Sequence, residues 1–210
     1  MKERGILLVV SGFAGSGKGT LMKELLKRYD NYALSVSATT RSPRPGEING
    51  VDYFFVTTEN FENMVAKNEL LEHAKYVSNY YGTPRGYVEE QLQAGKDVLL
   101  EIEIQGALII KEKYPEALLL FVIPPSVQEV YGRLKKRGTE TKEVIASRMR
   151  RAKEEAEMIG RYDYLIINDD LDTCVQTLHH VVMSAHCAVF RNYDTINKIK
   201  RQFVDFLEGE

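Results

Sequence analysis

The sequence predicts an α/β fold in which helices cover both faces of a parallel β-sheet. Two observations lead to this prediction. Short continuous apolar runs recur along the chain, and stretches with apolar residues at helical spacing separate them. Such runs are typical of strands buried on both faces, and strands that alternate with helices are typical of a parallel sheet. A third observation is that residues 37–93 break this rhythm, which predicts an inserted part.

The first predicted strand, Ile6–Val10, leads into a glycine-rich stretch and then into a helix over Lys18–Tyr29. Further buried strands are expected at Val98–Ile104, Leu118–Ile123 and Tyr164–Ile167. The insertion contains the segment "SATTRSPRPGEINGVDYFFV", with two prolines and two glycines beside aromatic residues. This composition predicts turns and antiparallel strands rather than a β-α-β unit.

Four helices are expected in the C-terminal half. Ser126 and Glu129 have the spacing of a capping box, and that helix should end at Gly138. The next helix covers residues 142–160 and carries one apolar face, made of Val144, Ile145, Met149, Ala152 and Ala156. The last two are marked by two apolar series, namely Leu171, Val175, Leu178, Val182 and Val189, and then Ile196, Ile199, Phe203 and Phe206. For the final series we expect packing and no other role.

Composition excludes several classes of protein. The chain has 210 residues, is 44% hydrophobic, and carries a net charge of −2, so nothing general favours nucleic acid or a membrane surface as partner. The N-terminal apolar run is too short for a signal peptide, and no run is long enough for a membrane span. Cys174 and Cys187 need no disulfide, which fits the cytoplasm. No obligate protein partner is expected.

The stretch "SGFAGSGKGT", residues 11–20, has the spacing of a phosphate-binding loop. Four glycines, Gly12, Gly15, Gly17 and Gly19, should allow positive φ angles and a close approach of phosphate to the backbone. Lys18 adds a mobile positive charge. The hydroxyl that usually follows the lysine and binds Mg²⁺ is displaced by one residue, to Thr20. A glycine-rich turn that binds nothing is the alternative.

Two clusters of arginines are further candidates. Arg41 and Arg44 flank Pro43 and should repel each other unless an anion lies between them; Tyr53 and Tyr81 could donate hydroxyls to the same anion. The alternative is a solvated basic turn. The second cluster lies on the helices at 126–160 and could close over a triphosphate: Arg133, Arg137, Arg148, Arg150 and Arg151. Ordinary surface ion pairs with the acids of "AKEEAE" are the alternative there.

Together these residues resemble the guanylate kinase family over almost the whole chain. The narrowest signals are T-T-R-x-P-R-x-G-E-x-x-G-x-D-Y, residues 39–53, and N-Y-Y-G-T, residues 79–83. The resemblance implies transfer of a phosphoryl group from ATP to GMP, and also to dGMP, with Mg²⁺. It also implies a CORE (1–36, 94–126 and 159–210), a GMP-binding part (37–93) and a helical LID (127–158).

The resemblance also assigns site residues, position by position. Lys18, Arg44, Arg137 and Arg148 would act on the transferred phosphoryl group. The ATP side would comprise the loop, Gly12, Phe13, Ala14, Gly15, Ser16, Gly17, Lys18, Gly19 and Thr20, with Arg133, Arg137, Asn168 and Asp169. The GMP side would comprise Ser37, Arg41, Arg44, Tyr53 and Tyr81 at the phosphate and Glu72 and Thr83 at guanine, with Glu101 nearby.

The sequence departs from the family pattern at a few positions. Phe13-Ala14 stands where Pro-Ser is frequent, and Glu101 and Glu103 stand where Asp is frequent. No residue is expected to bind metal directly; Mg²⁺ would be held by the phosphates and by water, which Glu101 or Glu103 could order. Two other functions remain open, a catalytically inactive interaction module of the same fold and a monophosphate kinase for another base.

Overall fold

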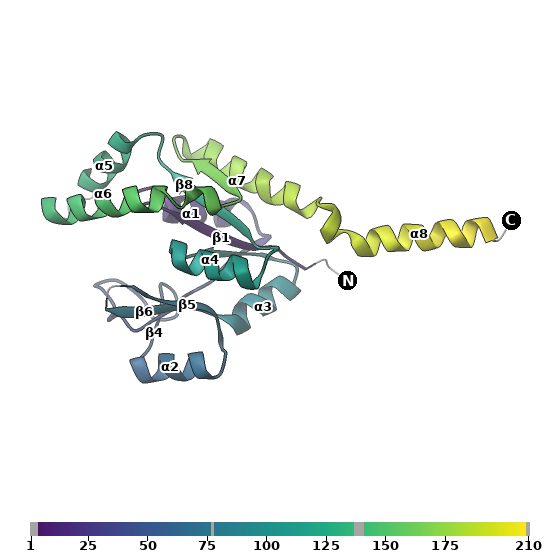
Figure 1. The fold of residues 1–210 in the computed structure, drawn as a ribbon, viewed down its shortest axis with the longest axis horizontal. Coiled ribbons are helices and arrows are strands. Elements are labelled where there is room, and N and C mark those ends of the chain that lie inside the picture. The colour runs from purple at the N-terminus through teal and green to yellow at the C-terminus, as the bar shows by residue number, and fades with distance from the viewer. Residues whose placement is uncertain (1–3, 77, 137–140, 209–210) are drawn as a thin grey trace. The chain divides into compact units, whose positions relative to one another are not determined.

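The computed structural model describes residues 4–76, 78–136 and 141–208. The chain divides into two compact units, Met1–Val175 and Gln176–Glu210. The first unit contains two sheets and most of the helices (Figure 1). The second contains the rest of α7 (Leu171–His186), a short 3₁₀ turn at Val189–Arg191, and α8 (Tyr193–Glu208). Among the described residues, no helix is long and apolar enough to span a membrane.

The larger sheet is parallel, as the apolar runs predicted, and has five strands, of which the one at Tyr32–Leu34 was not predicted. Their order is β2 (Tyr32–Leu34), β7 (Asp97–Glu101), β1 (Leu7–Gly12), β8 (Leu118–Ile123) and β9 (Tyr164–Ile167). The central strand β1 pairs with β7 on one side and β8 on the other. Residues Leu8, Val9 and Val10 are completely buried, because helices cover both faces of a sheet of this kind. The α/β fold class is therefore confirmed.

Two element boundaries and the burial of one strand differ from the prediction. β7 ends at Glu101, because Ile104 already opens helix α4 (Ile104–Lys113). β9 is one of the two edge strands of this sheet, and Leu165 and Ile167 are 47% and 56% exposed, so it is not the buried strand we expected. Helix α7 ends at His186, and Val189 lies beyond it with 65% exposure. An apolar run alone does not reveal which side of a strand is covered.

The insertion forms a second, four-stranded sheet in the order β4 (Phe54–Phe55), β3 (Ala38–Thr39), β6 (Asn79–Pro84), β5 (Leu70–Tyr76). Its β3–β6 and β5–β6 pairs are antiparallel, as expected, whereas β3 and β4 are parallel. The sequence reading missed helix α2 (Thr58–Ala66), which Thr57 caps by accepting the Asn60 N–H. Phe61 of α2 is buried in the small core beside this sheet.

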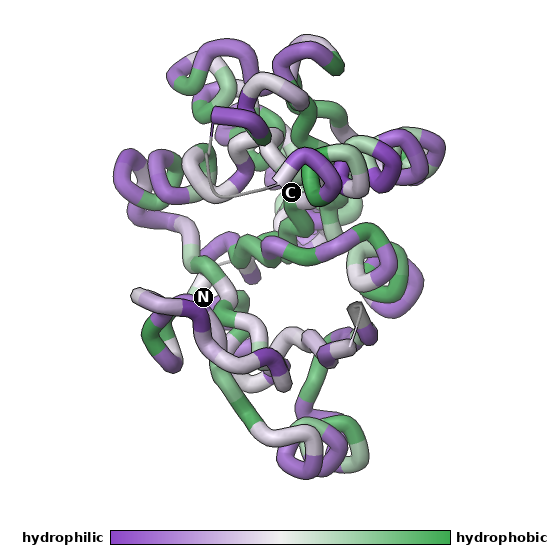
Figure 2. The backbone as a smooth tube through the Cα atoms, turned by 90° about the vertical axis from the view of Figure 1, so that its left-hand side faces the viewer, coloured by the Kyte–Doolittle hydropathy of each residue, from purple (hydrophilic) through white to green (hydrophobic). Residues whose placement is uncertain are grey.

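Helices α1 (Lys18–Arg28), α3 (Arg85–Gln93), α5 (Val127–Lys136) and α6 (Lys142–Ala156) complete the first unit. In Figure 2 the helical segments change between hydrophilic and hydrophobic residues from turn to turn. Val88 and Leu92 of α3 join the core of the larger sheet, so this helix packs with the sheet although it follows the insertion in sequence. The predicted cap of α5 is present, since the Ser126 hydroxyl accepts the Glu129 N–H. No α8 side chain is buried, so the expected packing of this segment is not observed.

Candidate active site

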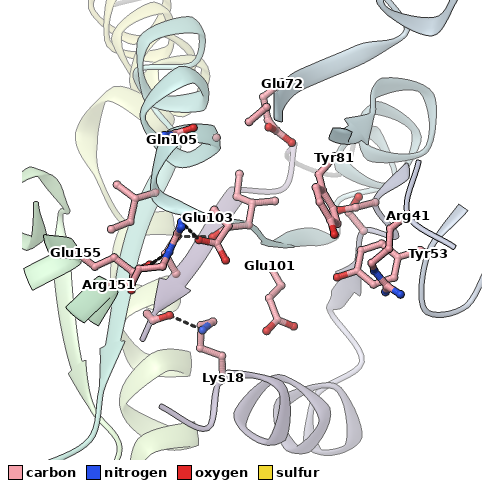
Figure 3. Close-up of a pocket in the computed structure, with 18 of the residues that line it drawn as sticks. Lys18, Arg41, Tyr53, Glu72, Tyr81, Glu101, Glu103, Gln105, Arg151 and Glu155 are labelled. Carbon is pink, nitrogen blue, oxygen red and sulfur yellow. Dashed lines mark hydrogen bonds and ion pairs between the residues drawn. The ribbon is translucent and has the colours of Figure 1, made fainter. Parts of the chain in front are cut away.

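A cavity of about 660 Å³ opens at the carboxyl ends of the central strands. Its lining comes from the end of β1, from Lys18, from the second sheet, from residues 101–106 and from α6 (Figure 3). Ligands of α/β proteins commonly bind in the crevice outside the carboxyl ends of the strands, and the volume is in the range of small-molecule sites. The cavity therefore has the position and size expected of a nucleotide site.

The glycine-rich loop joins β1 to α1, and three of its glycines are required by geometry. Gly12, Gly15 and Gly17 have φ angles of 153°, 85° and 88°. A Cβ atom on Gly12 would lie 2.1 Å from the Val122 carbonyl oxygen, and one on Gly17 would lie 2.4 Å from Asn168 Nδ2. Gly19 differs, because it lies inside α1 without a positive φ angle and a Cβ there would meet nothing within 4 Å. The prediction that Gly19 supplies a positive φ is wrong.

Two polar side chains hold this loop through its backbone. Asn168, which directly follows β9, donates from Nδ2 to the Ser16 carbonyl oxygen at 2.7 Å. Arg133 of α5 donates to the same oxygen at 3.4 Å and to the Asn168 carbonyl oxygen at 2.9 Å. The Ser16 hydroxyl is buried and has no hydrogen-bond partner. The loop is thus fixed from the side of α5 and β9 and retains one unsatisfied polar atom.

The loop also packs against the predicted LID. Phe13 and Ala14 contact the apolar cluster of Val130, Leu134 and Ile145, which joins α5 to α6. The Phe13 ring also meets the edge of Phe121 in β8, with ring centroids 5.3 Å apart. Apolar residues in place of Pro-Ser therefore link the loop to the LID helices, a connection that the loop sequence by itself does not reveal.

Lys18 lines the cavity, and its ammonium group donates to the carbonyl oxygens of Gly12 and Phe13. Among the described residues of the predicted ATP side, only Gly12 and Lys18, together with the predicted catalytic Arg148, line the cavity. Thr20 and Asp169 are exposed, and Asn168 is buried. Of loop residues 12–20, only Gly12 and Lys18 therefore face the cavity.

A charged network crosses the cavity wall near Lys18. Arg151 donates to Glu103 at 3.0 Å and to Glu155 at 2.9 Å (Figure 3). Glu101 lines the same cavity; desolvation by its surroundings raises the pKa of this carboxyl, and the nearby Lys18 charge opposes that rise. Since Glu103 is already paired with Arg151, Glu101 is the better placed of the two to meet a ligand. Arg151 was one of the candidate arginines, and its pair with Glu155, four residues later, matches the alternative of helix ion pairs with the acids of "AKEEAE". The pair with Glu103 was not predicted.

One face of α6 lines the cavity, through Val144, Ser147, Arg148, Arg151 and Glu155. Arg148 and Arg151, two of the candidate arginines, thus share one face of α6. Arg150 is exposed and does not line the cavity, so it matches the surface alternative. Arg137, the other predicted LID arginine, falls in residues 137–140, outside the described residues.

Arg41, Tyr53 and Tyr81 gather at the opposite end of the cavity (Figure 3). The Arg41 guanidinium lies 5.3 Å from the Tyr53 ring centroid, and the two tyrosine ring centroids are 6.1 Å apart. Arg41 forms a bidentate ion pair with Glu47, which also accepts the backbone N–H of Arg44. The hydrogen bonds that Arg41 donates to Glu47, and its interaction with Tyr81, raise the pKa of Arg41.

The side chain of Arg41 is only 15% exposed, so the alternative of a solvated basic turn does not hold for this residue. Ser37 and Arg44 also line the cavity. From the sequence we expected an anion beside these arginines. In this structure the carboxylate of Glu47 is the anion that pairs with Arg41. Glu47 was not among the predicted site residues, although it lies three residues after Arg44 in the motif.

Glu72 of β5 also lines the cavity, while Thr83 of β6 does not. The Thr83 hydroxyl donates to Glu72 at 2.7 Å, and the two residues are 0% and 4% exposed. The Thr83 hydroxyl proton is thus directed to Glu72 in this structure, and a contact of Thr83 with guanine stays a prediction. Burial raises the pKa of Glu72. Gly106 leaves room for this carboxylate, since a Cβ there would lie 2.7 Å from Glu72 Oε2.

Comparisons with known proteins agree with this arrangement. The family model described as guanylate kinase matches residues 4–185. The chain belongs to the guanylate kinase family. It is 53% identical to a guanylate kinase of Halalkalibacterium halodurans over 89% of this chain and 91% of that one. A guanylate kinase of Caldanaerobacter subterraneus is 45% identical over 97% of this chain and 99% of its own.

A solved structure supports the same assignment. The crystal structure of guanylate kinase from Anaplasma phagocytophilum has a TM-score of 0.74 and 32% identity, and the match covers 90% of each chain. The match of the family model ends at residue 185, so α8 lies outside the region that defines the family. The cavity, the glycine-rich loop and the described LID residues all lie within that region.

Proposed function

We propose that this chain is a guanylate kinase, which transfers the γ-phosphoryl group of ATP to GMP and yields ADP and GDP. The observation that carries the proposal is that one cavity is lined both by Lys18 of the phosphate loop and by the Arg41–Tyr53–Tyr81 cluster. A phosphoryl transfer enzyme needs two phosphate sites that face each other. Use of dGMP as a second acceptor belongs to the same proposal.

On the donor side, the loop Gly12–Thr20 would hold the ATP phosphates through backbone N–H groups and the N-terminus of α1. Lys18 would leave the loop carbonyls that it now contacts and bind the β- and γ-phosphates. Arg44, Arg137 and Arg148 would reach the transferred group, where positive charge stabilises the transition state. Arg133, Asn168 and Asp169 complete the proposed ATP side.

On the acceptor side, Ser37, Arg41, Arg44, Tyr53 and Tyr81 would bind the GMP phosphate, since forked guanidinium donors suit phosphate. Glu72 would accept guanine N1–H and N2–H, two donors that adenine lacks. Thr83 supports this reading by its hydrogen bond to Glu72, and Glu101 lies within reach of the same cavity.

Mg²⁺ would enter with ATP and neutralise the charge that develops on its phosphates. The residues present fit such an ion: Glu101 is a cavity carboxylate close to Lys18 and could order water around it. The proposed parts are the GMP-binding part at 37–93 and the LID at 127–158, which would close on the CORE and exclude water from the phosphoryl group.

A coupled assay that detects GMP-dependent ADP formation tests the proposal. We expect ADP only when ATP and GMP are both present. No ADP formation with any nucleoside monophosphate would support the inactive interaction module instead. ADP formation with AMP, CMP or UMP in preference to GMP would support a monophosphate kinase for another base.

A further inference from the structure

We infer that α8 is an interaction surface for a second copy of this chain, and that the two α8 helices pack against each other in an antiparallel pair. The surface is the apolar series Ile196, Ile199, Phe203 and Phe206, which Leu207 borders. The series lies beyond residue 185, where the match of the family model ends, and none of its residues lines the cavity. Pairing through α8 would therefore be independent of the proposed function.

The apolar face of α8 is exposed. None of the described side chains of this helix is buried, and Phe203 and Phe206 are 64% and 65% exposed. A helix of about 15 residues is only marginally stable in water by itself, and most helices in proteins are stabilised by packing of one amphipathic face. A contiguous apolar patch of this kind is typical of an interaction site. We therefore expect another surface to cover α8.

The apolar series is complementary to itself. Its spacings of three, four and three residues place all four side chains on one face of a helix. The four positions are also symmetric about Arg201. A two-fold axis beside Arg201 would set Ile196 of one copy against Phe206 of the second copy, and Ile199 against Phe203, so each residue meets its counterpart twice.

This arrangement pairs side chains of different size. Each contact joins a smaller β-branched isoleucine to a larger phenylalanine, and alternation of small and large side chains fills the space between two helices evenly. A parallel pair would instead set phenylalanine against phenylalanine and isoleucine against isoleucine. The order of the residues along α8 therefore favours the antiparallel pair.

The charges of α8 favour the same direction. Apart from Asp194, the charged residues are basic up to Arg201 and acidic after it. An antiparallel pair sets the basic part of each helix near the acidic part of the other and opposes the two helix dipoles. This contribution is small, because the charges are exposed. The two copies of Arg201 need not meet, since a residue two positions before Phe203 points to the opposite side of the helix.

The exposed apolar area fits a small interface between two copies. The exposed Tyr193 and Val204 border the series. A half-exposed aromatic or large aliphatic side chain offers on the order of 100 Å², so one copy presents roughly 500 Å². A standard interface buries about 800 Å² on each partner, so we expect reversible association with a Kd in the micromolar range. A membrane surface fits less well, because the polar face carries acids as well as bases.

Sedimentation of the full chain between about 1 and 100 µM tests the inference. We expect the molecular mass of the wild-type protein to double over this range. Phe203→Glu places a charge within the interface and should halve the mass that the wild-type protein reaches. Asn197→Glu is the matched control, because it adds the same charge at an exposed position of α8 outside the series and should leave the mass unchanged. Thermal unfolding checks that both variants are folded.

A mixture of two variants tests the direction of the pair. Ile199→Lys alone should also be monomeric. In the antiparallel pair position 199 of one copy faces position 203 of the other, so Ile199→Lys and Phe203→Glu should associate when they are mixed. A mixture that stays monomeric would overturn the antiparallel arrangement.

Three further results would overturn the inference. The first is a wild-type protein that stays monomeric at about 100 µM. The second is a Phe203→Glu variant that keeps the wild-type mass, which would place the contact between copies on another surface. The third is a monomeric wild-type protein that sediments with vesicles of phosphatidylcholine and phosphatidylserine, which would assign α8 to a membrane surface.

Discussion

The two ends of the cavity are built in different ways. The donor end lies against the backbone of the glycine-rich loop, of which Gly12 and Lys18 line the cavity. Three glycines of this loop have positive φ angles, and contacts from α5 and Asn168 hold it in place. The acceptor end is made of side chains from several segments of the insertion, among them Arg41, Tyr53, Glu72 and Tyr81. A backbone site can hold any phosphate chain, whereas a side-chain site can distinguish one base from another. We therefore expect the donor end to provide affinity for phosphates and the acceptor end to provide selectivity for the base.

The largest expected effect comes from removing the one mobile charge of the donor end. Lys18→Met should lower kcat/KM by roughly 10²-fold or more, because the ammonium would act on a shielded phosphate in the transition state. Steady-state kinetics with ATP and GMP measures this, and thermal unfolding checks that the fold is intact. Retention of more than about a tenth of wild-type activity would refute the role of Lys18.

An arginine of α6 that lines the cavity, Arg148, should act on rate more than on binding. Arg148→Ala should lower kcat by about tenfold or more and leave the KM for GMP nearly unchanged, since its charge is needed where charge develops. The same reasoning applies to Arg137→Ala. Arg150→Ala is the matched control, because Arg150 lies on the same helix but is exposed and outside the cavity. If Arg148→Ala and Arg150→Ala behave alike, Arg148 is an ordinary surface residue.

A smaller effect on activity is expected at the acceptor end from Glu47, the residue that orients Arg41. Glu47→Gln weakens the bidentate pair that holds Arg41. We expect the KM for GMP to rise several-fold, about the effect of one charged hydrogen bond partly exposed to solvent, with kcat and the KM for ATP unchanged. An equal rise in both KM values would show that the change is not confined to the acceptor end.

The two ends also differ in how far the sequence predicts them. The loop was predicted well because its geometry is local: glycine spacing and the lysine lie within one short stretch between a strand and a helix. Gly19 was misread because the pattern does not show where the helix begins. The contacts that hold the loop, from Arg133 and Asn168, come from residues more than a hundred positions away.

At the acceptor end the candidate residues were named, but their pairing was not. Glu47 lies six residues after Arg41 in one loop, and the motif does not show that the turns between them bring the two together. That Thr83 donates to Glu72 depends on how β5 and β6 align, and no local pattern gives that register. For the same reason Arg151 was named only as one of a cluster of candidate arginines. Its partner Glu103, on another element, was not predicted. The parallel sheet was predictable because apolar runs require burial; the exposed side of β9 was not.

The central claim is that side chains of the acceptor end, Glu72 above all, select guanine. The most direct measurement is kcat/KM for GMP, IMP and AMP in the wild-type protein and in Glu72→Gln. IMP keeps N1–H and O6 and lacks only the amino group, so it isolates the second hydrogen bond to the carboxylate. We expect wild type to use GMP well, IMP poorly, and AMP worse by ~10⁴-fold or more. Glu72→Gln should reduce the GMP-to-AMP ratio by at least about tenfold and leave ATP affinity unchanged. If wild type uses IMP as well as GMP, Glu72 does not read the amino group and the account of selectivity is wrong.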